Sequence, residues 1–378
     1  MNIGLLYPLT GVASGFGNPI VDGFKFAFDR INAAGGVKNP NGMNISINPV
    51  LVDTESSPDV APQKAEELGN RSDILLVSGV SQSAAVLQVA QVFARLNVPL
   101  LCSVDARDEL TSSGFTQTFR IPPGFDTGSR FIVRAMDEIG TAAGEPMTKV
   151  AIIYHSGVPA VGDSMEEEAT KLGFNVAEKI SYDSQTEDFT TMMVRLKDTG
   201  VDGLILNVLS ADAIKLVQVM KQLDYNPLGV GAHAGGFNDA GFVATLGADA
   251  ENMITAGWFF TDEQVDGADA VVNEWKQTTG NDIPILAPLG ISAAAVVANA
   301  LSRVEELSRE ALIQALSETD MQLGEDDFLV ANGCKFDATG VNTAFVHVVG
   351  QYQGGVGKSI WPPDIAGGEA VWPRPAWS

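Results

Sequence analysis

The sequence predicts an α/β protein made of two Rossmann-like, doubly wound domains in tandem. Short apolar runs typical of strands buried on both faces alternate with stretches of helical periodicity along the first two thirds of the chain. Pro122-Pro123-Gly124 divides this alternation into two similar series. With 378 residues, the chain is long enough for two domains.

The best-defined stretch is Asp73–Ala106, which has the size and pattern of one βαβ unit. The apolar run Ile74–Val77 precedes a turn, Ser78–Ser83, that leads into a helix. Backbone N–H groups and the positive end of the helix dipole converge at such a turn, which makes it a candidate carboxylate site. The alternative is that Ser83 only caps the helix, a frequent role of serine.

The remaining elements of both series follow from the same patterns. A Gly-rich loop, Gly11–Gly17, leads into the first helix, which glycines end at Gly35 and Gly36. In the first series we expect strands Ile3–Tyr7, Ile45–Val52 and Thr116–Ile121, and helices Asn18–Ala33 and Pro58–Leu68. In the second series we expect strands Lys149–Tyr154, Asn175–Ser181, Gly203–Val208, Leu228–Ala232 and Met253–Phe259, with helices Gly128–Ile139, Gly162–Leu172, Asp188–Asp198, Ala211–Leu223 and a short one near Phe242.

The last third of the chain does not continue the alternation. Its pattern predicts three helices, Val265–Thr278, Pro288–Val304 and Arg309–Ser317. A β-hairpin is expected from Cys334–Asp337 and Phe345–Gln351, bridged by Ala338-Thr339-Gly340, and the tail Ile360–Ser378 has no periodicity. A run of helices after an α/β series is compatible with a return of the chain to its first domain, but periodicity alone does not predict this return.

Composition excludes some classes of partner. The formal net charge of −24 repels nucleic acid and anionic lipid over most of the surface. No apolar run reaches the length of a membrane span. We interpret Cys102 and Cys334 as two buried thiols, because a disulfide framework would need more cysteines. Met1 is interpreted as replacing a removed export signal, although a cytoplasmic protein would look the same.

Signatures of catalysis and of metal binding are missing from the sequence. Gly354–Ser359 ends like a P-loop, but Tyr352 stands where that motif needs its first glycine, and we interpret the stretch as a solvent turn. The turn after Gly79 resembles a nucleophile elbow whose closing glycine is replaced by Ser83. The three histidines have no metal-binding spacing. We therefore expect a binding protein without cofactor, metal or catalytic residues, and not an enzyme.

Several stretches together resemble a known family. Ile3–Gly11 (IGLLYPLTG) and Ile31–Val37 (INAAGGV) are similar to the opening of type I periplasmic binding proteins, in the leucine/isoleucine/valine-binding branch. These proteins are the solute receptors of ABC importers. Further similarities lie at Val98–Leu101, Phe119-Arg120 with Pro122, Asp188-Phe189, and Phe336-Asp337 with Gly340.

The resemblance implies a Venus-flytrap fold of two α/β lobes joined by three crossing segments. Function would be hinge closure around a small molecule in the cleft and its delivery to an ABC permease, by a monomer that works in the periplasm or another extracytoplasmic space. The expected crossings lie near Thr118–Ile121, Thr255–Trp258 and Phe328–Ala331. The expected lobes are 1–120 with 257–329 and 121–256 with 330–378.

The resemblance also implies ligand-binding positions. The loop after the third strand would give a serine to the ligand carboxylate, and the spacing to Val98-Pro99 selects Ser83 over the neighbouring Ser81. The other implied positions are Phe16, Val104, Asp105, Ala106, Ala160 or Val161, Leu209 and His233.

Departures from the family leave the ligand open. Amino-acid receptors of this branch often have a hydroxyl at Ala106 and an acid at His233, which bind the ammonium group. Phe16, Val161 and Leu209 replace cleft tyrosines, and an unpaired ammonium in so apolar a pocket would be costly. One hypothesis is an apolar or aromatic carboxylate with His233, also a candidate pH-sensitive group, as polar partner. The other is a hydrophobic amino acid whose ammonium pairs with Asp105.

Two other classes of protein remain as alternatives. Similar lobes serve as ligand-sensing receptor domains and as amide-sensing regulators, although a sensor domain would be expected to continue into a membrane segment. An enzyme on this fold would need a cofactor loop or a catalytic cluster, and neither is visible in the sequence.

Overall fold

A computed structural model describes residues 1–104, 107–183, 185–233, 236–238, 240–330 and 332–377. The chain forms two compact units, each built from two separate stretches. Unit 1 is Met1–Phe125 with Val265–Val346, and unit 2 is Asp126–Gln264 with His347–Ser378. The chain passes from one unit to the other three times, so the predicted two-lobed α/β class is confirmed.

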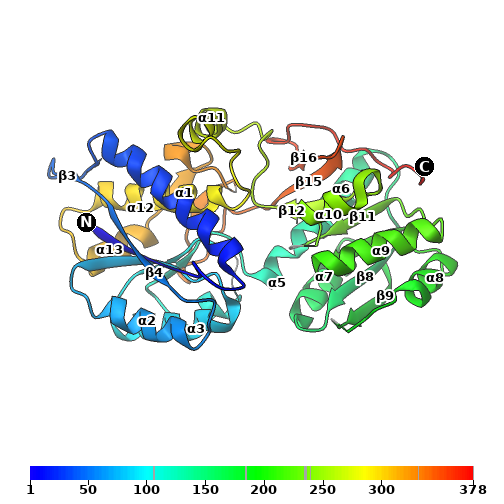
Figure 1. Cartoon of the computed structure of the whole chain (residues 1–378), viewed down its shortest axis with the longest axis horizontal. Coiled ribbons are helices and arrows are strands. Elements are labelled where there is room, and N and C mark those ends of the chain that lie inside the picture. The colour runs from blue at the N-terminus through cyan, green and yellow to red at the C-terminus, as the bar shows by residue number, and fades with distance from the viewer. Residues whose placement is uncertain (105–106, 184, 234–235, 239, 331, 378) are drawn as a thin grey trace. The chain divides into compact units, whose positions relative to one another are not determined.

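Unit 1 is built on a five-stranded parallel sheet of order β4-β1-β5-β6-β7 (Figure 1). Helices α1 and α12 cover one face, and α2 and α3 cover the other. Gly23 in α1 allows close packing on α12, because a Cβ there would lie 2.1 Å from the Ala287 carbonyl oxygen. The strands are β1 (Asn2–Tyr7), β4 (Asn48–Asp53), β5 (Ile74–Gly79), β6 (Leu100–Cys102) and β7 (Thr118–Arg120). The helices are α1 (Ser14–Ala33), α2 (Val60–Gly69), α3 (Ser83–Arg95), α4 (Glu109–Ser112), α11 (Ala268–Thr279), α12 (Ala287–Arg303) and α13 (Arg309–Ser317).

The three helices α11, α12 and α13 belong to unit 1. The family resemblance, and not periodicity, predicts them in the first lobe. Smaller elements complete the unit: the strand pairs β2 (Val37–Lys38) with β3 (Asn44–Ile45) and β13 (Asp320–Gln322) with β14 (Gly333–Lys335), and the 3-10 turn η2 (Glu325–Asp327). A buried apolar core of side chains such as Leu6, Val77, Val89 and Phe93 fixes α3 against the sheet.

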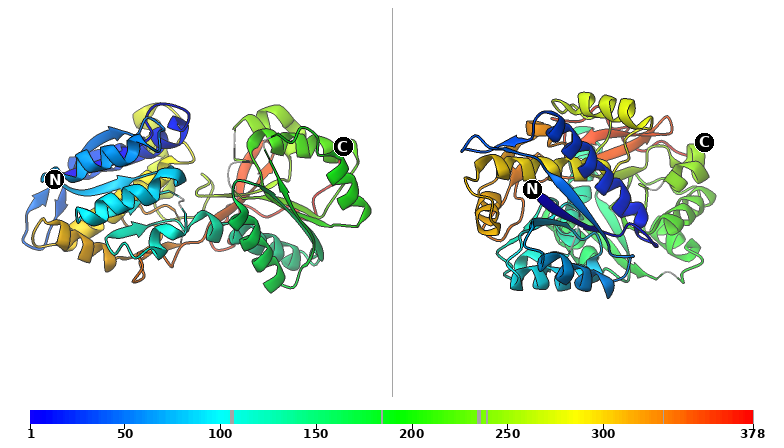
Figure 2. Two further views of the ribbon diagram at one scale, coloured as in Figure 1. Left: turned by 90° about the horizontal axis from the view of Figure 1, so that it is seen from below. Right: turned by 60° about the vertical axis from the view of Figure 1, so that its left-hand side comes forward.

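Unit 2 is built on a seven-stranded sheet of order β16-β15-β12-β11-β10-β8-β9. The five strands from β12 to β9 run parallel, and β15 and β16 run antiparallel at one edge. The strands are β8 (Lys149–His155), β9 (Asn175–Tyr182), β10 (Gly203–Asn207), β11 (Gly229–Ala232), β12 (Ile254–Gly257), β15 (Val348–Gln353) and β16 (Val356–Trp361). The helices are α5 (Phe125–Gly128), α6 (Arg130–Ala142), α7 (Pro159–Lys171), α8 (Thr190–Asp198), α9 (Ser210–Gln222), α10 (Ala240–Leu246) and the 3-10 turn η1 (Gly247–Ala250). Figure 2 shows the helices on both faces of this sheet.

The unit boundaries fall later in the chain than the predicted lobe boundaries at 120/121, 256/257 and 329/330. The difference is largest at the third boundary, because the segment before Val346 is bound to β7. There the Arg120 N–H donates to the Gly340 carbonyl at 2.8 Å, and the Asn342 N–H donates to the Arg120 carbonyl at 3.1 Å. The rings of Phe119 and Phe336 pack with centroids 5.2 Å apart.

The predicted hairpin between Cys334–Asp337 and Phe345–Gln351 is wrong. β14 pairs with β13 instead, and β15 pairs with β16 around the turn Gly354-Gly355. The turn at Ala338–Gly340 exists. However, β15 pairs with β12, a strand of the unit 2 sheet, and not with the segment before this turn. The stretch interpreted as a solvent turn is therefore a turn only at Gly354-Gly355, and from Val356 on it is part of β16.

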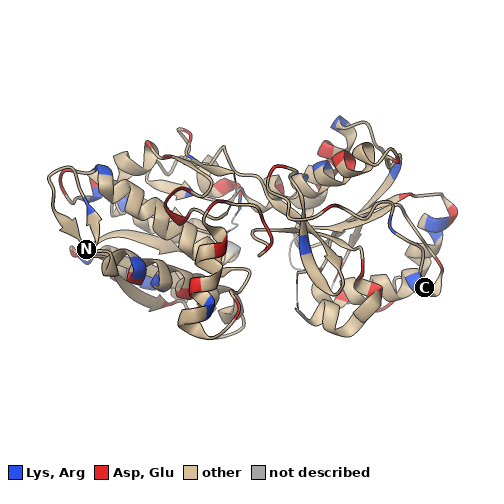
Figure 3. Cartoon of the chain, turned by 90° about the horizontal axis from the view of Figure 1, so that it is seen from above, with Lys and Arg blue, Asp and Glu red and all other residues tan. Residues whose placement is uncertain are grey.

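The chemistry of the surface agrees with the composition. Acidic and basic residues are interspersed along the chain in both units (Figure 3), and the acidic residues are in excess. Cys102 and Cys334 are buried free thiols, as predicted. Over the described ranges, every helix is too short or too polar to cross a bilayer.

Candidate functional site

The carboxyl ends of the parallel strands form one edge in each unit, and open α/β sheets bind ligands at this edge. In unit 1 a buried hydroxyl cluster fixes the edge. The Tyr7 Oη lies 2.9 Å from Ser78 Oγ and 2.6 Å from Ser103 Oγ, and Ser78 Oγ donates to the Leu101 carbonyl at 2.8 Å. Burial raises the pKa of Tyr7 well above its usual value, so the phenol stays neutral. The ends of β1, β5 and β6 are thereby bound to one another.

The turn between β5 and α3 carries the predicted serines. Gly79 has φ +153°, and a Cβ there would lie 2.3 Å from the Leu6 carbonyl oxygen, so a side chain would not fit. The hydroxyl of Ser81 is buried and has no hydrogen-bond partner among the described residues. A buried hydroxyl without a partner is costly, which makes Ser81 available to a ligand.

The predicted serine cap at Ser83 is wrong, because Gln82 occupies the N-cap position and Ser83 is the first residue of α3. The Gln82 side chain makes no capping hydrogen bond to the helix start. Instead, its amide donates to the Ser56 carbonyl, in the loop after β4, at 2.9 Å. The side chain of Ser83 lies outside the described part of the structure.

A second polar network ties the loops after β1 and β4 together. The carboxylate of Asp53 accepts hydrogen bonds from the Leu9 N–H at 2.8 Å, the Thr10 hydroxyl at 2.6 Å and the Glu55 N–H at 2.7 Å. Partial burial raises the pKa of Asp53, but these hydrogen bonds outweigh it and hold the pKa below its usual value. Asp53 is therefore an ionised anchor for both loops.

Ser56 joins the loop after β4 to the first turn of α1. Its hydroxyl donates to the Thr10 carbonyl at 2.6 Å and accepts from the Ala13 N–H at 3.0 Å. The loop held in this way exposes two apolar side chains, Val12 fully and Phe16 by 48%. Phe16 thus stands at the unit 1 edge, in the first turn of α1.

The loop after β6 is described only in part. Val104 is nearly buried, and its carbonyl accepts a hydrogen bond from the Cys102 thiol at 3.0 Å. Asp105 and Ala106, the other two predicted positions in this loop, lie outside the described residues. Unit 1 thus gathers Phe16, Ser81, Ser83 and Val104 at one edge.

The matching edge of unit 2 is apolar. Leu209, at the N-cap position of α9, is 50% exposed, and its N–H donates to the Tyr182 hydroxyl at 3.0 Å. Burial raises the pKa of Tyr182 to about 12. Val161 is fully buried in the first turn of α7, whereas its neighbour Ala160 is exposed.

His233 directly follows β11 and is only 1% exposed. Its backbone N–H donates to the Leu206 carbonyl at 2.8 Å. Its ring packs edge to face on the ring of His347, with the two ring centroids 5.5 Å apart. His347 is also 1% exposed, and its Nδ1 lies 3.1 Å from the Gly257 carbonyl oxygen. Sequence reasoning missed His347, because it lies more than a hundred residues after His233 and no short motif links the two.

Metal binding finds no support in the described part of the chain. Within those residues, no group of three or more histidine, cysteine, aspartate or glutamate side chains is placed to hold a metal ion.

Comparison with known proteins gives one consistent result. A family model described as periplasmic binding protein matches residues 1–347. The chain is 24% identical over 387 residues to Leu/Ile/Val-binding protein homolog 7 of Brucella suis biovar 1, covering 99% of this chain and 94% of that protein.

Solved structures of the same fold carry different ligands. The branched-chain amino acid transporter substrate-binding protein LivJ of Streptococcus pneumoniae, in complex with isoleucine, superposes with a TM-score of 0.74 at 20% identity, covering 99% of each chain. An ABC transporter solute-binding protein of R. palustris, in complex with benzoate, superposes with a TM-score of 0.73 at 16% identity, covering 98% of this chain and 97% of that one.

Proposed function

This chain belongs to the periplasmic binding protein family, and from that premise we propose that it is the solute-binding receptor of an ABC importer. It would capture a small apolar or aromatic carboxylate, or a hydrophobic amino acid, and deliver it to the membrane subunits of a permease. The proposal includes an extracytoplasmic location, a monomeric state and a role in binding rather than catalysis.

The observation that carries this proposal is the start of α3. The buried Ser81 hydroxyl lacks a partner among the described residues, and it lies directly before a helix start that no described side chain caps. A helix N-terminus with free N–H groups favours an anion, and a nearby hydroxyl can donate one further hydrogen bond. A ligand carboxylate would satisfy both groups.

The ligand body would be apolar. Phe16 and Leu209 expose large apolar surfaces at the edges of their units. Isoleucine and benzoate, the ligands of two proteins with the same fold, are both small carboxylates with apolar bodies. They differ in the ammonium group, for which Asp105 is the candidate partner in this chain.

We propose that the two units are the lobes that close on the ligand, with Phe16, Ser81, Ser83, Val104, Asp105 and Ala106 contributed by unit 1 and Val161, Leu209 and His233 by unit 2. A ligand can drive closure only if it binds the closed state more tightly than the open state. Ligands that touch both lobes do this, and hinge closure is a common response in two-lobed binding proteins.

Isothermal titration calorimetry with leucine, phenylalanine and benzoate tests the proposal. Saturable binding of at least one of them is expected. Tight binding of leucine would favour the amino-acid hypothesis and reject the plain carboxylate, whereas binding of benzoate alone would do the reverse. If none of the three binds, the proposed ligand class is wrong.

A further inference from the structure

Three rings form a continuous cluster at the carboxyl edge of the unit 2 sheet. His233 follows β11, Trp258 follows β12, and His347 precedes β15. The His347 ring centroid lies 5.5 Å from that of His233 and 6.2 Å from that of Trp258. Phe131 of α6 packs against the cluster, with its ring centroid 5.5 Å from that of His347. These strands are adjacent in the sheet, so the cluster spans β11, β12 and β15.

The backbone under the cluster is held by specific hydrogen bonds. His347 Nδ1 lies 3.1 Å from the carbonyl oxygen of Gly257, the residue directly before Trp258. Asn238, in the loop that begins with His233, donates to the Ala256 carbonyl at 2.7 Å and accepts from the Thr255 hydroxyl at 2.8 Å. The loop after β11 and the end of β12 are therefore fixed to each other, and the indole stands on a rigid base.

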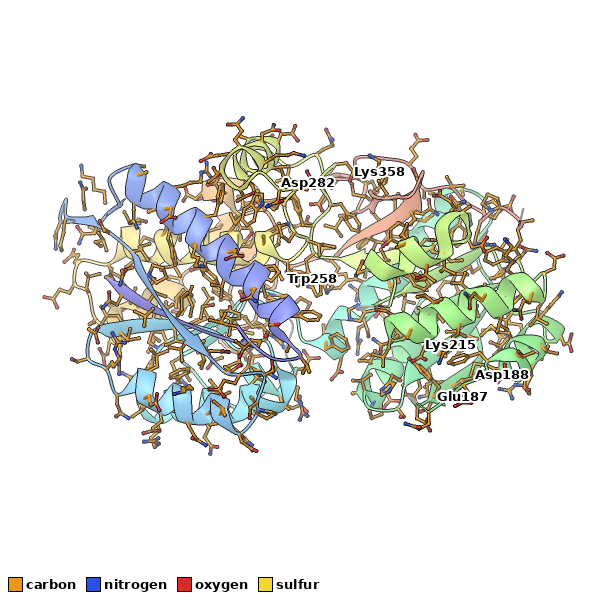
Figure 4. All side chains as sticks on the ribbon, viewed as in Figure 1. Glu187, Asp188, Lys215, Trp258, Asp282 and Lys358 are labelled. Carbon is orange, nitrogen blue, oxygen red and sulfur yellow. The ribbon has the colours of Figure 1, made fainter. Side chains whose placement is uncertain are left out.

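The three rings differ in how much of their surface is exposed. Both histidines are 1% exposed, so they lie under the surface of the edge. Trp258 is only partly buried, and Figure 4 shows it on the segment that leaves β12. Because the indole of Trp258 is more exposed than either imidazole, a ligand at this edge can contact Trp258 while both histidines remain covered.

We propose that Trp258 is the specificity-determining residue of unit 2, which selects ligands with a flat aromatic body, and that His347 is its positioning residue. This inference rests on the proposed function and names a substrate class for it, the aryl carboxylates. An indole offers a large rigid face, and paired aromatic rings gain stability beyond their buried area. A branched aliphatic ligand would gain only the free energy of burying its apolar surface.

The first experiment measures how each substitution changes the ratio of benzoate affinity to leucine affinity. Calorimetry with benzoate and leucine is done on wild type, Trp258→Leu and Trp258→Phe. We expect Trp258→Leu to lower benzoate affinity roughly tenfold or more and leucine affinity less than about threefold. Trp258→Phe should keep most of the preference for benzoate. A purely structural tryptophan would lower both affinities by the same factor.

Intrinsic fluorescence gives a second readout that does not depend on the leucine variant folding. The chain has five tryptophans, and we expect addition of benzoate to change the emission of wild type and of the control Trp372→Phe. The change should be lost in Trp258→Phe. Circular dichroism of each variant confirms that the fold is intact.

The positioning role of His347 has its own matched pair of variants. Asparagine can place an N–H close to the position of Nδ1, so His347→Asn should keep the contact with the Gly257 carbonyl, and His347→Ala should lose it. We expect the ratio of benzoate to leucine affinity to fall roughly fivefold or more in His347→Ala and to recover in His347→Asn.

The outcomes separate the two proposals. If wild type binds none of benzoate, leucine and phenylalanine, the proposed ligand class fails and this inference fails with it. If wild type binds, but Trp258→Leu keeps the wild-type ratio of benzoate to leucine affinity and Trp258→Phe keeps the fluorescence change, the role of Trp258 alone is overturned. Loss of the preference and of the fluorescence change together supports it.

Discussion

The carboxyl edges of the two sheets have opposite chemistry. In unit 1, hydroxyls and a carboxylate bind strand ends to one another, through Tyr7 with its serine partners and through Asp53 with the loops around it. In unit 2, the edge carries Leu209 and a cluster of rings, in which His347 Nδ1 faces the Gly257 carbonyl. The two series of βα elements are similar in plan, yet one edge suits a charged head group and the other an apolar body.

The acids near the two edges show the same contrast. Asp53 in unit 1 accepts four hydrogen bonds, and they keep its pKa low. Glu263 in unit 2, on the segment after β12, is 4% exposed; one oxygen accepts from the Phe260 N–H and the other has no partner among the described residues. Burial raises its pKa well above the usual value. The environment of Asp53 thus stabilises a carboxylate, whereas the environment of Glu263 favours the protonated acid.

The largest effect is expected from Gly79→Ala, which disrupts the polar edge. The new methyl group would lie 2.3 Å from the Leu6 carbonyl oxygen, so β1 and β5 would have to separate. We expect a loss of about 3 kcal/mol or more in the free energy of unfolding, measured by urea denaturation. Gly15→Ala is the control, because nothing lies within 4 Å of its Cβ position and it should change stability by less than about 1 kcal/mol. Equal effects in the two variants would contradict the steric argument.

Ser81→Ala tests whether the polar edge binds the carboxylate. Hydrogen bonds to charged groups contribute about 1.5–3 kcal/mol, so affinity for a carboxylate ligand should fall roughly tenfold to a hundredfold. Stability should not fall, because the Ser81 hydroxyl has no partner to lose among the described residues. Ser83→Ala is measured in parallel and decides which serine contributes more. Ser113→Ala, an exposed serine bonded to the Glu109 carbonyl, is the control; unchanged affinity in both test variants would refute the proposed carboxylate site.

The sequence was sufficient for the fold class, because buried parallel strands and amphipathic helices leave strong local patterns. It failed for the hairpin at Cys334–Asp337, since the choice of partner for β15 depends on the distant strand β12. It also failed at Ser83, where a common capping residue lies one position inside the helix.

Only part of the candidate site was predicted, because some of its residues are brought together by long-range strand pairing. The βα turn of Ser81 is contiguous in sequence and was found there. His347 and Trp258 become neighbours of His233 only through the order of strands in the sheet, and periodicity carries no information on that order.

Glu263→Gln tests the apolar edge through its dependence on pH. Because the folded-state pKa is raised, the folded protein keeps its proton while the unfolded chain loses it above its ordinary pKa of about 4.3. Wild-type stability therefore falls as pH rises from that value toward the folded pKa. Glutamine does not titrate, so the variant should be more stable than wild type near pH 7, and this gain in the free energy of unfolding should shrink toward pH 4. A difference that does not change with pH would show that Glu263 is ionised in the folded state.

Asp53→Asn should give a smaller effect with the opposite dependence on pH. The folded-state pKa is lowered here, so the stability that the carboxylate contributes is present above the unfolded pKa of about 3.9 and is lost as pH falls through the folded pKa. Solvent screens this partly exposed group, so we expect a loss of only about 0.5–1 kcal/mol near pH 7, and the difference from wild type should disappear in acid. Denaturation curves of both acid variants over the same pH range provide the comparison. Opposite slopes would confirm that one edge favours a negative charge and the other does not, whereas parallel curves would remove the electrostatic distinction between the two units.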